Sequence, residues 1–467
     1  MSEIAIMGGG IAGLCGAMLL ARDGHHVTVL ERDPRRPTEP GDAWSEWERP
    51  GVNQFRLAHA FLPRFRVALD AELPGVVDGL VADGALRVNR IDQLPAQISG
   101  GRRPGDERFD QVTGRRPMVE ASLARMAVAE PGVDIRRGVS VKGLLVAEPS
   151  RATVPHVAGV VTSDGDRLHA DLVVDAGGRR SSLPDLLEAA GVRRPGDDVD
   201  DSGFIYYARH FRSEDGRMPA MMGPPLQHYD SISTATLVAD RGHWSFVLVA
   251  HAKDALMRRA RHVDVWDRVT RSYPLVAHWF DAEPVTGIDV MARIADRRRH
   301  FDVDGEPIAT GLVAVGDAWA CTSPSLGRGA STAALHSVCL RDAVRKAGTD
   351  DARALIRCWN ETTDAVVTPL VEDTLAVDRH RLAQIEAQMC GATYEANDPG
   401  WTFAQALTAF SSRDPDLVRA AMDVGGMLER GVTVAARPGI VDTLRALGEV
   451  TTPPGPDRAE LEAIVAG

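Results

Sequence analysis

The first 31 residues alternate between apolar runs typical of buried strands and a run with helical spacing. Residues 4–7 and 27–30 are short apolar runs that predict two parallel strands, and the residues between them predict a helix. Three glycines where this helix opens, Gly8, Gly10 and Gly13, follow the spacing Gly-x-Gly-x-x-Gly. Strand, glycine turn, helix, strand and a closing acidic residue, Glu31, stand in the register of a dinucleotide-binding unit.

This register predicts a bound dinucleotide. Gly8 permits the tight turn, Gly10 lets backbone N–H groups approach a pyrophosphate, and Gly13 lets the helix pack closely on the strand. The diphosphate would lie at the positive end of the helix, and Glu31 would accept the ribose hydroxyls. An empty turn is the alternative, because glycine is common in this chain (44 residues).

Residues 171–183 predict a third strand of the same kind, which ends in Asp175 and Gly177. Such strand ends belong at the carboxyl edge of a parallel sheet, where glycines admit a ligand beside the backbone. We interpret Asp175 as a cofactor contact, with a helix cap as the alternative.

Residues 312–344 predict a strand, a loop and a helix that return the chain to the same sheet. The strand ends in Gly316 and Asp317, the loop contains Pro324 and a glycine turn over residues 327–329, and residues 330–344 have helical spacing. Loop N–H groups at a positive helix start can hold a partial negative charge. Asp317 can accept hydrogen bonds from cofactor hydroxyls.

The segments between these elements supply further candidates. Residues 31–51 are rich in proline, charge and glycine, which predicts a mobile loop. Arg56 is a candidate second clamp on a diphosphate, because a guanidinium meets phosphate oxygens two at a time; a surface ion pair is the alternative. His59 is either a structural histidine or a cofactor contact.

Residues 115–128 predict a helix that opens at Arg116, just before a proline. Residues 133–146 alternate well enough for strands. Val139 lies where backbone could meet an adenine edge, although it could equally be an ordinary strand residue.

The pattern changes over residues 201–250, where β-branched and aromatic residues alternate. This predicts antiparallel strands of a different sheet, and residues 85–115 predict strands and loops that leave the nucleotide-binding part. Beyond residue 345 the pattern is helical, with a last short helix after the proline-glycine cluster 451–456. The aromatic residues that could either contact a substrate or pack are Tyr206, Tyr207, Phe211, Trp244 and Phe246.

Composition limits the classes of function. A chain of 467 residues can bury a large core, and 44% hydrophobic and 25% charged residues are ordinary values. The net charge of −12 disfavours nucleic acid or an anionic membrane as partner, and no run approaches the ~20 apolar residues of a membrane span. The first strand begins almost at once, which leaves no room for a signal peptide, so we expect a cytoplasmic location.

Two other features suggest no chemistry. Five cysteines without pair spacing indicate neither a disulfide framework nor a zinc site. The basic run 297–300, flanked by Asp296 and Asp302, predicts a solvated loop, with contact to the phosphate of a nicotinamide cofactor as the alternative.

Three stretches, GGGIAG with Glu31, VVDAGGRRSS and GDAWACTSPSLGRGAS, occur in this order along the chain. With them the sequence resembles FAD-dependent monooxygenases of the single-component aromatic hydroxylase superfamily. The segments GVNQFRLAHAF and DSGFIYYARHFR are most similar to flavin epoxidases and hydroxylases that tailor bacterial polyketides. The resemblance covers about residues 1–350 and leaves the C-terminal helices without a motif.

The resemblance implies an α/β fold with a Rossmann-like FAD-binding domain, an inserted β-sheet substrate domain and a C-terminal helical region. The FAD-binding domain would comprise residues 1–84, 116–200 and 306–349. The substrate domain would comprise residues 85–115 and 201–305, and the helical region residues 350–467.

It also implies FAD held extended, with Glu31 on the ADP half, Arg56 and Arg116 along the diphosphate and ribityl side, and Asp317 on the ribitol. In relatives the aspartate of the middle motif touches the cofactor and influences reduction by NAD(P)H, a role carried here to Asp175. Pro324 and the turn 327–329 would border the isoalloxazine ring. The residues assigned to the cofactor are Gly8, Gly10, Ile11, Ala12, Gly13, Glu31, Arg32, Arg56, Arg116, Val139, Asp175, Gly177, Gly316, Asp317, Pro324, Gly327, Arg328, Gly329 and Ala330. Candidates for the pocket beside the flavin are Pro324, Trp319, Tyr206 and Trp244, with no certain catalytic residue and no metal ligand.

The implied reaction inserts one oxygen atom from O2, through a flavin hydroperoxide, into a mostly apolar, polyketide-like substrate with an aromatic ring or alkene. Hydroxylation and epoxidation both fit, NAD(P)H is the expected electron donor, and a separate flavin reductase is left open. A flavin-dependent halogenase is an alternative, although residues 243–246 lack the Trp-x-Trp-x-Ile-Pro pattern of that class. An isoprenoid double-bond reductase and a flavin-binding partner without turnover are the others.

The chain departs from the family at two points. Relatives often have Asp-Gly where this chain has Asp175-Ala176. After the later Gly-Asp pair they often have Ala-His, where this chain has Ala318-Trp319. The first departure bears on direct NADPH binding, and the second on the shape of the pocket beside the flavin.

Overall fold

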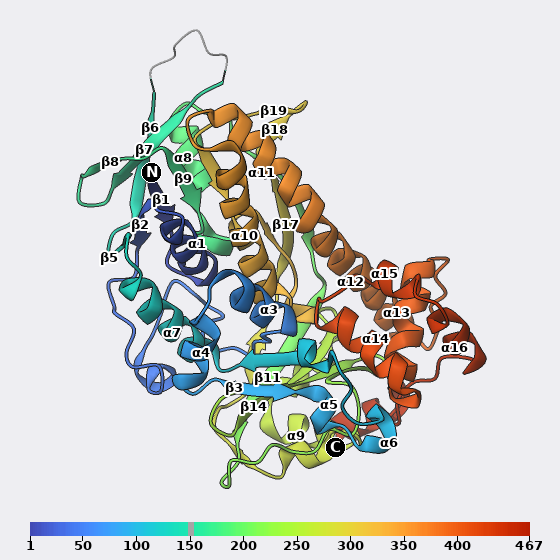
Figure 1. Ribbon diagram of the computed structural model, residues 1–467. Coiled ribbons are helices and arrows are strands. Elements are labelled where there is room, and N and C mark those ends of the chain that lie inside the picture. Colours follow the sequence, from blue (N-terminus) through green and yellow to red (C-terminus); the bar gives the residue numbers. More distant parts are fainter. Residues whose placement is uncertain (148–153) are drawn as a thin grey trace.

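The computed structural model describes residues 1–147 and 154–467. A five-stranded parallel sheet, in the upper part of Figure 1, has the order β20-β9-β1-β2-β5. All five strands are short, and four of them are mostly buried, as expected for strands covered on both faces, whereas the edge strand β5 is more polar and only partly buried. Their bounds are β1 (Glu3–Met7), β2 (His26–Glu31), β5 (Val133–Arg137), β9 (Leu172–Asp175) and β20 (Leu312–Ala314).

Helices and a small sheet pack around the parallel sheet. α1 (Ile11–Arg22) contacts both α7 (Arg116–Ala129) and the long helix α10 (Gly329–Ala347). β7 of a small antiparallel sheet contacts β9. The remaining elements of this part are α3 (Pro63–Glu72), α4 (Val76–Ala82), α8 (Leu183–Ala189), β6 (Val141–Val146), β7 (Val157–Thr162), β8 (Arg167–His169), β18 (Asp302–Val303) and β19 (Glu306–Pro307).

A second, antiparallel sheet forms the lower part of the molecule (Figure 1) and has the order β12-β13-β14-β11-β15, with β16 also paired to β11. Its residues alternate between two faces, as the period of two along a strand requires. One face packs on α9 (Val263–Arg271), and the other is directed toward α12. The strands are β11 (Phe204–Arg212), β12 (Leu226–His228), β13 (Ser233–Val238), β14 (His243–His251), β15 (Glu283–Pro284) and β16 (Asp289–Met291).

A separate hairpin is formed by β3 (Leu86–Asn89) and β4 (Asp110–Thr113). The segment that connects these two strands contains the short helices α5 (Arg90–Gln93) and α6 (Ala96–Ser99).

The prediction of a loop over residues 297–300 is wrong. The run belongs to strand β17 (Ala295–His300), which lies between β10 (Gly196–Asp201) and β21 (Ala320–Cys321) in a three-stranded antiparallel sheet. The acidic strand β10 faces the basic run residue by residue, with Asp197 opposite Arg299 and Asp198 opposite Arg298. Opposite charges on paired strands stabilise the sheet. The charged run 297–300, which the sequence predicts to be a solvated loop, is therefore part of a strand.

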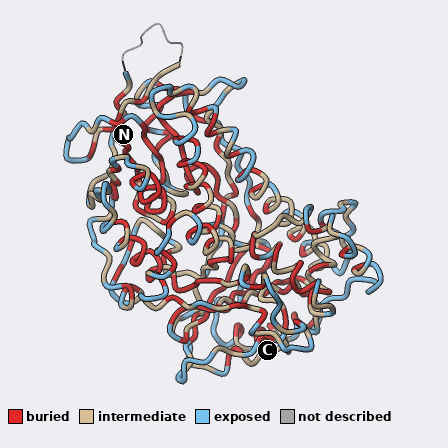
Figure 2. Tube along the Cα trace, viewed as in Figure 1, coloured by how far each residue is buried: buried red, intermediate tan, exposed pale blue. Residues whose placement is uncertain are grey.

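The expected mobile loop over residues 31–51 is also packed in its second half. It contains the short helix α2 (Ala43–Glu46), and Trp47 and Arg49 are buried. Figure 2 shows how burial is distributed along the chain. Tertiary contacts therefore order a segment whose local composition favours a loop.

The C-terminal part is helical, as expected, and reaches along both sheets. α12 runs from the parallel sheet to the antiparallel one, and α17 returns to pack on α9 beside the C-terminus (Figure 1). Within the described residues, no helix has the length and apolar character needed to cross a membrane. The helices are α11 (Ala352–Val366), α12 (Thr368–Met389), α13 (Pro399–Phe410), α14 (Pro415–Gly425), α15 (Gly431–Ala435), α16 (Ile440–Ala446) and α17 (Arg458–Ala466).

Candidate active site

One large cavity joins the carboxyl edge of the parallel sheet to the antiparallel sheet and the C-terminal helices. Its volume is about 1920 Å³. A site for one small ligand is typically about 300–1,000 Å³, so this cavity has room for a dinucleotide together with a second molecule.

The glycine turn after β1 forms one end of the cavity. Gly8 has φ +111°, and a Cβ added to it would lie 2.6 Å from the Ala176 carbonyl oxygen at the end of β9. A Cβ on Gly13 would collide with the Gly8 carbonyl oxygen, whereas one on Gly10 would meet no atom within 4 Å. No side chain caps the start of α1, so its N–H groups are available to an anion in the cavity.

Glu31 is buried, and backbone N–H groups and an arginine hold its carboxylate. Gly9 N–H donates to Oε2 and Asp33 N–H donates to Oε1, each at 2.9 Å. The Arg49 guanidinium also pairs with Oε2 and reaches Glu120 on α7 with its other terminal nitrogen. Sequence reasoning missed Arg49, because this arginine lies in a segment that reads as a loop.

The ion pairs continue from Glu120 to the middle of the cavity. Arg116 Nε donates to Glu120 Oε1 at 2.6 Å, and Arg116 Nη1 donates to His59 Nε2 at 2.9 Å. Burial alone would raise the pKa of Glu120, but the guanidinium groups of Arg116 and Arg49 outweigh it and lower that pKa. The carboxylate is therefore ionised, and it links the two arginines that border the cavity.

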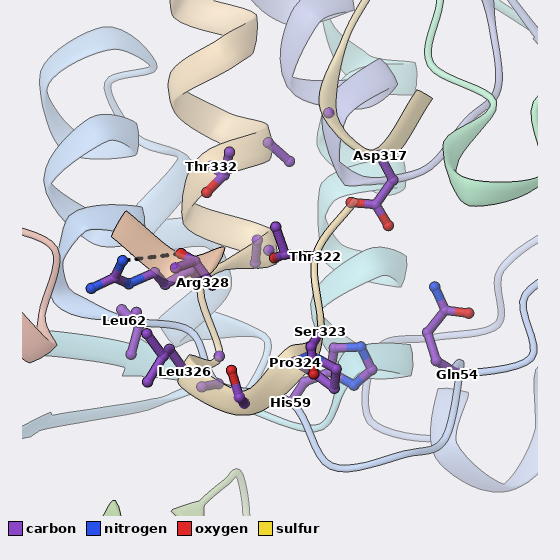
Figure 3. A pocket seen from close by; sticks show the side chains of 18 of the residues that line it. Gln54, His59, Leu62, Asp317, Thr322, Ser323, Pro324, Leu326, Arg328 and Thr332 are labelled. Carbon is purple, nitrogen blue, oxygen red and sulfur yellow. Dashed lines mark hydrogen bonds between the residues drawn. The ribbon is translucent and has the colours of Figure 1, made fainter. Parts of the chain in front are cut away.

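His59 is neutral in this setting. Burial, and then the charge of Arg116, lower the pKa of His59 to about 3. Its Nδ1 lies 2.8 Å from the Leu57 carbonyl oxygen, an acceptor, so Nδ1 carries the proton and Nε2 accepts from Arg116. His59 borders the cavity together with Gln54, which sequence analysis did not single out (Figure 3).

Asp175, in the middle motif, ends β9 beside the glycine turn. Its Oδ1 accepts from Gly177 N–H at 2.9 Å, and its Oδ2 accepts from the Ser181 hydroxyl. Burial raises the pKa of Asp175, although both hydrogen bonds oppose that rise. Asp175 borders the cavity, but its hydrogen bonds indicate that it shapes the turn, which is close to the helix-cap alternative.

Asp317, after β20, has a different environment. Within the described part of the chain, no side-chain or backbone group donates a hydrogen bond to its carboxylate, which points toward the cavity (Figure 3). Burial raises the pKa of Asp317, while the positive charges of Arg179, Arg116 and Arg297 act against this rise. The Arg297 guanidinium holds this loop by donating to the carbonyl oxygens of Arg179 and Asp317 at 3.0 and 3.3 Å. Asp317 is thus free to accept from hydroxyl groups of a ligand.

The turn before α10 also borders the cavity. Gly327 has φ +66°, and its Cβ would lie 2.6 Å from the Ala60 Cβ. No side chain caps the start of α10, which leaves its first N–H groups open to partial negative charge. Arg328 donates to Thr374 Oγ1 on α12 at 3.0 Å, so this helix is tied to the turn (Figure 3).

Apolar side chains of the antiparallel sheet form the far wall. Val247 and Val249 on β14 and Met291 on β16 border the cavity together with Tyr206 on β11. The Tyr206 hydroxyl hydrogen-bonds the Ser323 hydroxyl of the loop before α10. This contact connects the antiparallel sheet to the loop before α10.

The structure brings most of the expected site residues to this cavity. Eighteen of them border it: Gly8, Gly10, Ile11, Ala12, Glu31, Arg32, Arg116, Val139, Asp175, Gly177, Tyr206, Gly316, Asp317, Pro324, Gly327, Arg328, Gly329 and Ala330. Gly13 does not border it and instead supports the turn from behind.

Three expected site residues lie elsewhere, which corrects those expectations. Arg56 points outward, donates to the Trp47 carbonyl oxygen at 3.2 Å and lies 4.0 Å from Glu48, so the surface interpretation holds for it. Trp244 lies on the face of the antiparallel sheet opposite Tyr206, and stacks on Phe211 in the core. Trp319 packs between Arg298 and His336, away from the cavity.

The C-terminal helices also border the cavity, which no sequence motif indicated. α12 to α15 contribute both apolar and polar groups, among them Trp401, Leu407 and Met422. The amphipathic pattern of a helix shows that one face is buried but not what that face contacts.

The residues present fit FAD. The open start of α1 and Glu31 suit the ADP half, Arg116 and His59 lie along the middle, and Asp317 offers an unpaired carboxylate to the ribitol. The open start of α10 suits the pyrimidine end of the ring. Together the fold and the site define an FAD-binding oxidoreductase with a separate antiparallel sheet beside the cavity.

Comparison with known proteins places the chain in a family. Residues 6–67 match the NAD(P)-binding Rossmann-like domain. Protein Rv3254 of Mycobacterium tuberculosis (strain ATCC 25618 / H37Rv) is 30% identical over 366 residues, which are 73% of this chain and 72% of that protein. Squalene monooxygenase of Mus musculus is 28% identical over 193 residues, 41% of this chain and 31% of that protein. The chain belongs to the FAD-dependent monooxygenase superfamily, whose members are oxidoreductases.

Solved structures share the fold. PqsL, a probable FAD-dependent monooxygenase from Pseudomonas aeruginosa, aligns with a TM-score of 0.58 and 16% identity over 82% of this chain and 99% of its own. The flavin-dependent brominase Bmp2 aligns with a TM-score of 0.61 and 14% identity over 95% of this chain and 99% of its own. At these identities the likeness establishes the fold and leaves the reaction to be argued from the site.

Proposed function

We propose that this protein is an FAD-dependent monooxygenase that inserts one oxygen atom from O2 into a mostly apolar small molecule, by hydroxylation or epoxidation, with NAD(P)H as electron donor. One observation carries the proposal. A single cavity runs from the glycine turn, past Asp317 and the start of α10, to the apolar face of the antiparallel sheet. A cofactor laid along its first half would place its reactive end against a ligand in the second half.

When bound, FAD supplies the oxygen activation, and the protein positions the reactants and excludes water. The start of α1, Glu31 and Asp317 would hold the cofactor, and the start of α10 would favour negative charge at its ring. Val247, Val249 and Met291 would keep water from the reacting atoms, because a dry pocket protects a reactive oxygen species from hydrolysis. His59 is neutral and oriented by Arg116, so it would add no net charge beside the cofactor.

An apolar, natural-product-like substrate is supported by the wall of the cavity and by the squalene monooxygenase relative, whose name states an apolar substrate. Halogenation is less well supported, although a brominase shares the fold. The chain has three lysines, Lys142, Lys253 and Lys346, and only Lys142 borders the cavity. Lys142 lies on β6, beside the parallel sheet and away from the apolar substrate wall, so it is poorly placed to direct a halogenating species.

The test is anaerobic mixing of the FAD-loaded protein with NADPH or NADH, with and without candidate phenols and polyenes, while flavin absorbance is followed. Bleaching without an added reductase, followed by incorporation of ¹⁸O from labelled O2 into product, is the expected result. A flavin that stays oxidised with both nucleotides would assign reduction to a separate reductase. Turnover without O2 would replace oxygenation by double-bond reduction.

A further inference from the structure

The cavity extends well beyond the region that a flavin and a single ring would need. Its far part lies between the segment after β3 and helices α13 to α15, and we call it the distal chamber. Its apolar walls are formed by Leu94, Ile98, Phe109, Trp401, Leu407 and Met422. A ligand that fills it must have a sizeable apolar body, because contact with these walls is favourable only for apolar surface.

A charged side chain, that of Arg90, borders the cavity at the start of the segment that contributes Leu94 and Ile98 to this lining. Arg90 opens helix α5, borders the cavity and is only partly exposed. Its Nε lies 3.4 Å from the Gln111 side-chain oxygen, and its two terminal nitrogens make no hydrogen bond or ion pair with any of the described residues. Burial alone lowers the pKa of Arg90 to about 10, with no carboxylate acting against it.

The neighbouring arginines show what is unusual about Arg90. Arg102 pairs with Asp92 and Asp110, at 2.9 and 3.1 Å. The other arginines packed around the hairpin, at positions 87, 108 and 419, likewise each have a carboxylate within 3.1 Å. A buried guanidinium without a counter-ion is costly, and proteins usually pair it or leave it in water. Arg90 borders the cavity, and none of the described residues pairs with its two terminal nitrogens, so they are available to an anionic group of a ligand.

We propose that the cavity binds an apolar molecule that carries one anionic group, such as a carboxylate or phenolate, and that Arg90 is the counter-ion of that group. The inference rests on the proposed function, because it identifies the substrate class of the same cavity. A guanidinium presents two parallel donors, which match a carboxylate, while the distal chamber buries the apolar body. The 2′-phosphate of NADPH is the other source of an anion, and the experiment separates the two.

The experiment uses the FAD-loaded protein and a matched probe pair, 1-pyrenebutyrate and its methyl ester, followed by pyrene fluorescence. The wild-type protein should bind the acid at least tenfold more tightly than the ester. Arg90→Met should lose this preference and bind the ester as the wild type does, and Arg90→Lys should retain part of it. Arg102→Met, an identical change at an exposed and already paired arginine, should behave as wild type.

Several results would overturn the proposal. These are failure of the wild type to bind the acid, an unchanged preference for the acid in Arg90→Met, and an equal loss of preference in Arg102→Met. If Arg90→Met instead raises the NADPH concentration needed for flavin bleaching tenfold and leaves the NADH concentration needed unchanged, Arg90 binds the 2′-phosphate of the nucleotide. FAD content and thermal midpoint verify folding, and Arg90→Gln gives the same comparison if the methionine variant does not fold. Binding is measured at equilibrium and does not depend on turnover. If Arg90→Met loses the preference for the acid but no oxygen is inserted into any substrate, the proposed function is contradicted and this inference is supported.

Discussion

At the scale of single residues, two glycines of the same turn have different roles: one allows close packing of the chain, and the other leaves space for a ligand. Gly13 has no room for a side chain, because its Cβ would collide with the Gly8 carbonyl oxygen. Gly10 has room, since its Cβ would meet no atom within 4 Å, and its φ of −90° suits any residue. Gly13 is thus required by the fold, whereas we expect the requirement for glycine at position 10 to come from the ligand.

We therefore expect Gly13→Ala and Gly10→Ala to fail differently. Gly13→Ala should destabilise the apo protein by about 1–3 kcal/mol through overpacking. Gly10→Ala should leave the apo protein as stable as wild type but weaken FAD binding at least about tenfold, or ~1.4 kcal/mol, because a methyl group enters the space beside the helix start. Chemical denaturation of the apo proteins and a fluorescence titration with FAD measure the two effects. Equal FAD affinity in Gly10→Ala would show that no diphosphate approaches this turn.

A buried acid near the start of α10 gives a prediction for pH. Asp378 on α12 accepts from the Ser325 hydroxyl at 2.6 Å with Oδ1, while its Oδ2 is buried without a partner among the described residues. Burial raises the pKa of Asp378 to about 7, with Asp296 adding to the rise and Ser325 and Arg328 opposing it. The Tyr206 hydroxyl shares this environment, and Asp378 raises the pKa of Tyr206 further.

Because the native Asp378 holds its proton up to about pH 7 and the unfolded chain loses it near ~3.9, stability should fall as pH rises through this window. Asp378→Asn keeps the acceptor for Ser325 and removes the charge. It should increase the free energy of unfolding by on the order of 1–3 kcal/mol at pH 8 and change it little at pH 4. Urea unfolding at both pH values measures this difference, with the exposed Asp350→Asn as control. The same gain at both pH values would rule out titration of Asp378 as the cause.

At the scale of elements, Arg49 joins parts of the chain that are far apart in sequence. It pairs with Glu31 at the end of β2 and with Glu120 on α7, and all three side chains are buried. Removing one member of a buried ion network leaves charges without partners. The segment around α2 is therefore held by this contact rather than by its own propensity.

Arg49→Met should cost about 3–5 kcal/mol of stability in the apo protein, because two carboxylates lose their shared partner. Arg56→Met, seven residues on and at the surface, should change stability by less than about 0.5 kcal/mol. Thermal unfolding of the apo variants compares them directly. A small loss in Arg49→Met would mean that Glu31 and Glu120 are solvated once the arginine is gone.

These elements also show what the sequence could and could not predict. The strands and helices around the glycine turns were predictable, because apolar runs and glycines act locally and fall at the strand ends. The roles of Arg49 and of strand β17 were not. Arg49 lies in a proline-rich segment and is placed by partners 18 and 71 residues away. β17 is formed by pairing with the acidic strand β10 on one side and with β21 on the other, and both are distant in sequence. Trp244 was misassigned because composition identifies a strand but not which of its faces meets the cavity.

At the scale of the whole molecule, the cavity separates the parallel sheet from the antiparallel sheet and the C-terminal helices. A large internal space of about 1920 Å³ removes packing contacts from the centre of the protein. The open helix starts, the Asp317 carboxylate and the two terminal nitrogens of Arg90 add polar groups without a side-chain partner among the described residues. The two sides should therefore be coupled weakly in the apo protein and strongly once the cavity is filled.

Removal of FAD should accordingly lower the thermal midpoint, and added FAD at about 100 times its dissociation constant should restore ~2.7 kcal/mol of stability. Hydrogen exchange should show the largest protection on reloading at the turn after β1, at the turn 324–329 and in the first turn of α10, because these segments would contact the cofactor. A ligand with an apolar body should then protect α13 to α15 in a second step that requires FAD to be in place. Protection of the C-terminal helices by FAD alone, with no further change on adding ligand, would instead mean that the flavin itself occupies the distal chamber. The antiparallel sheet face at Trp244, which lies away from the cavity, serves as the internal reference that neither ligand should protect.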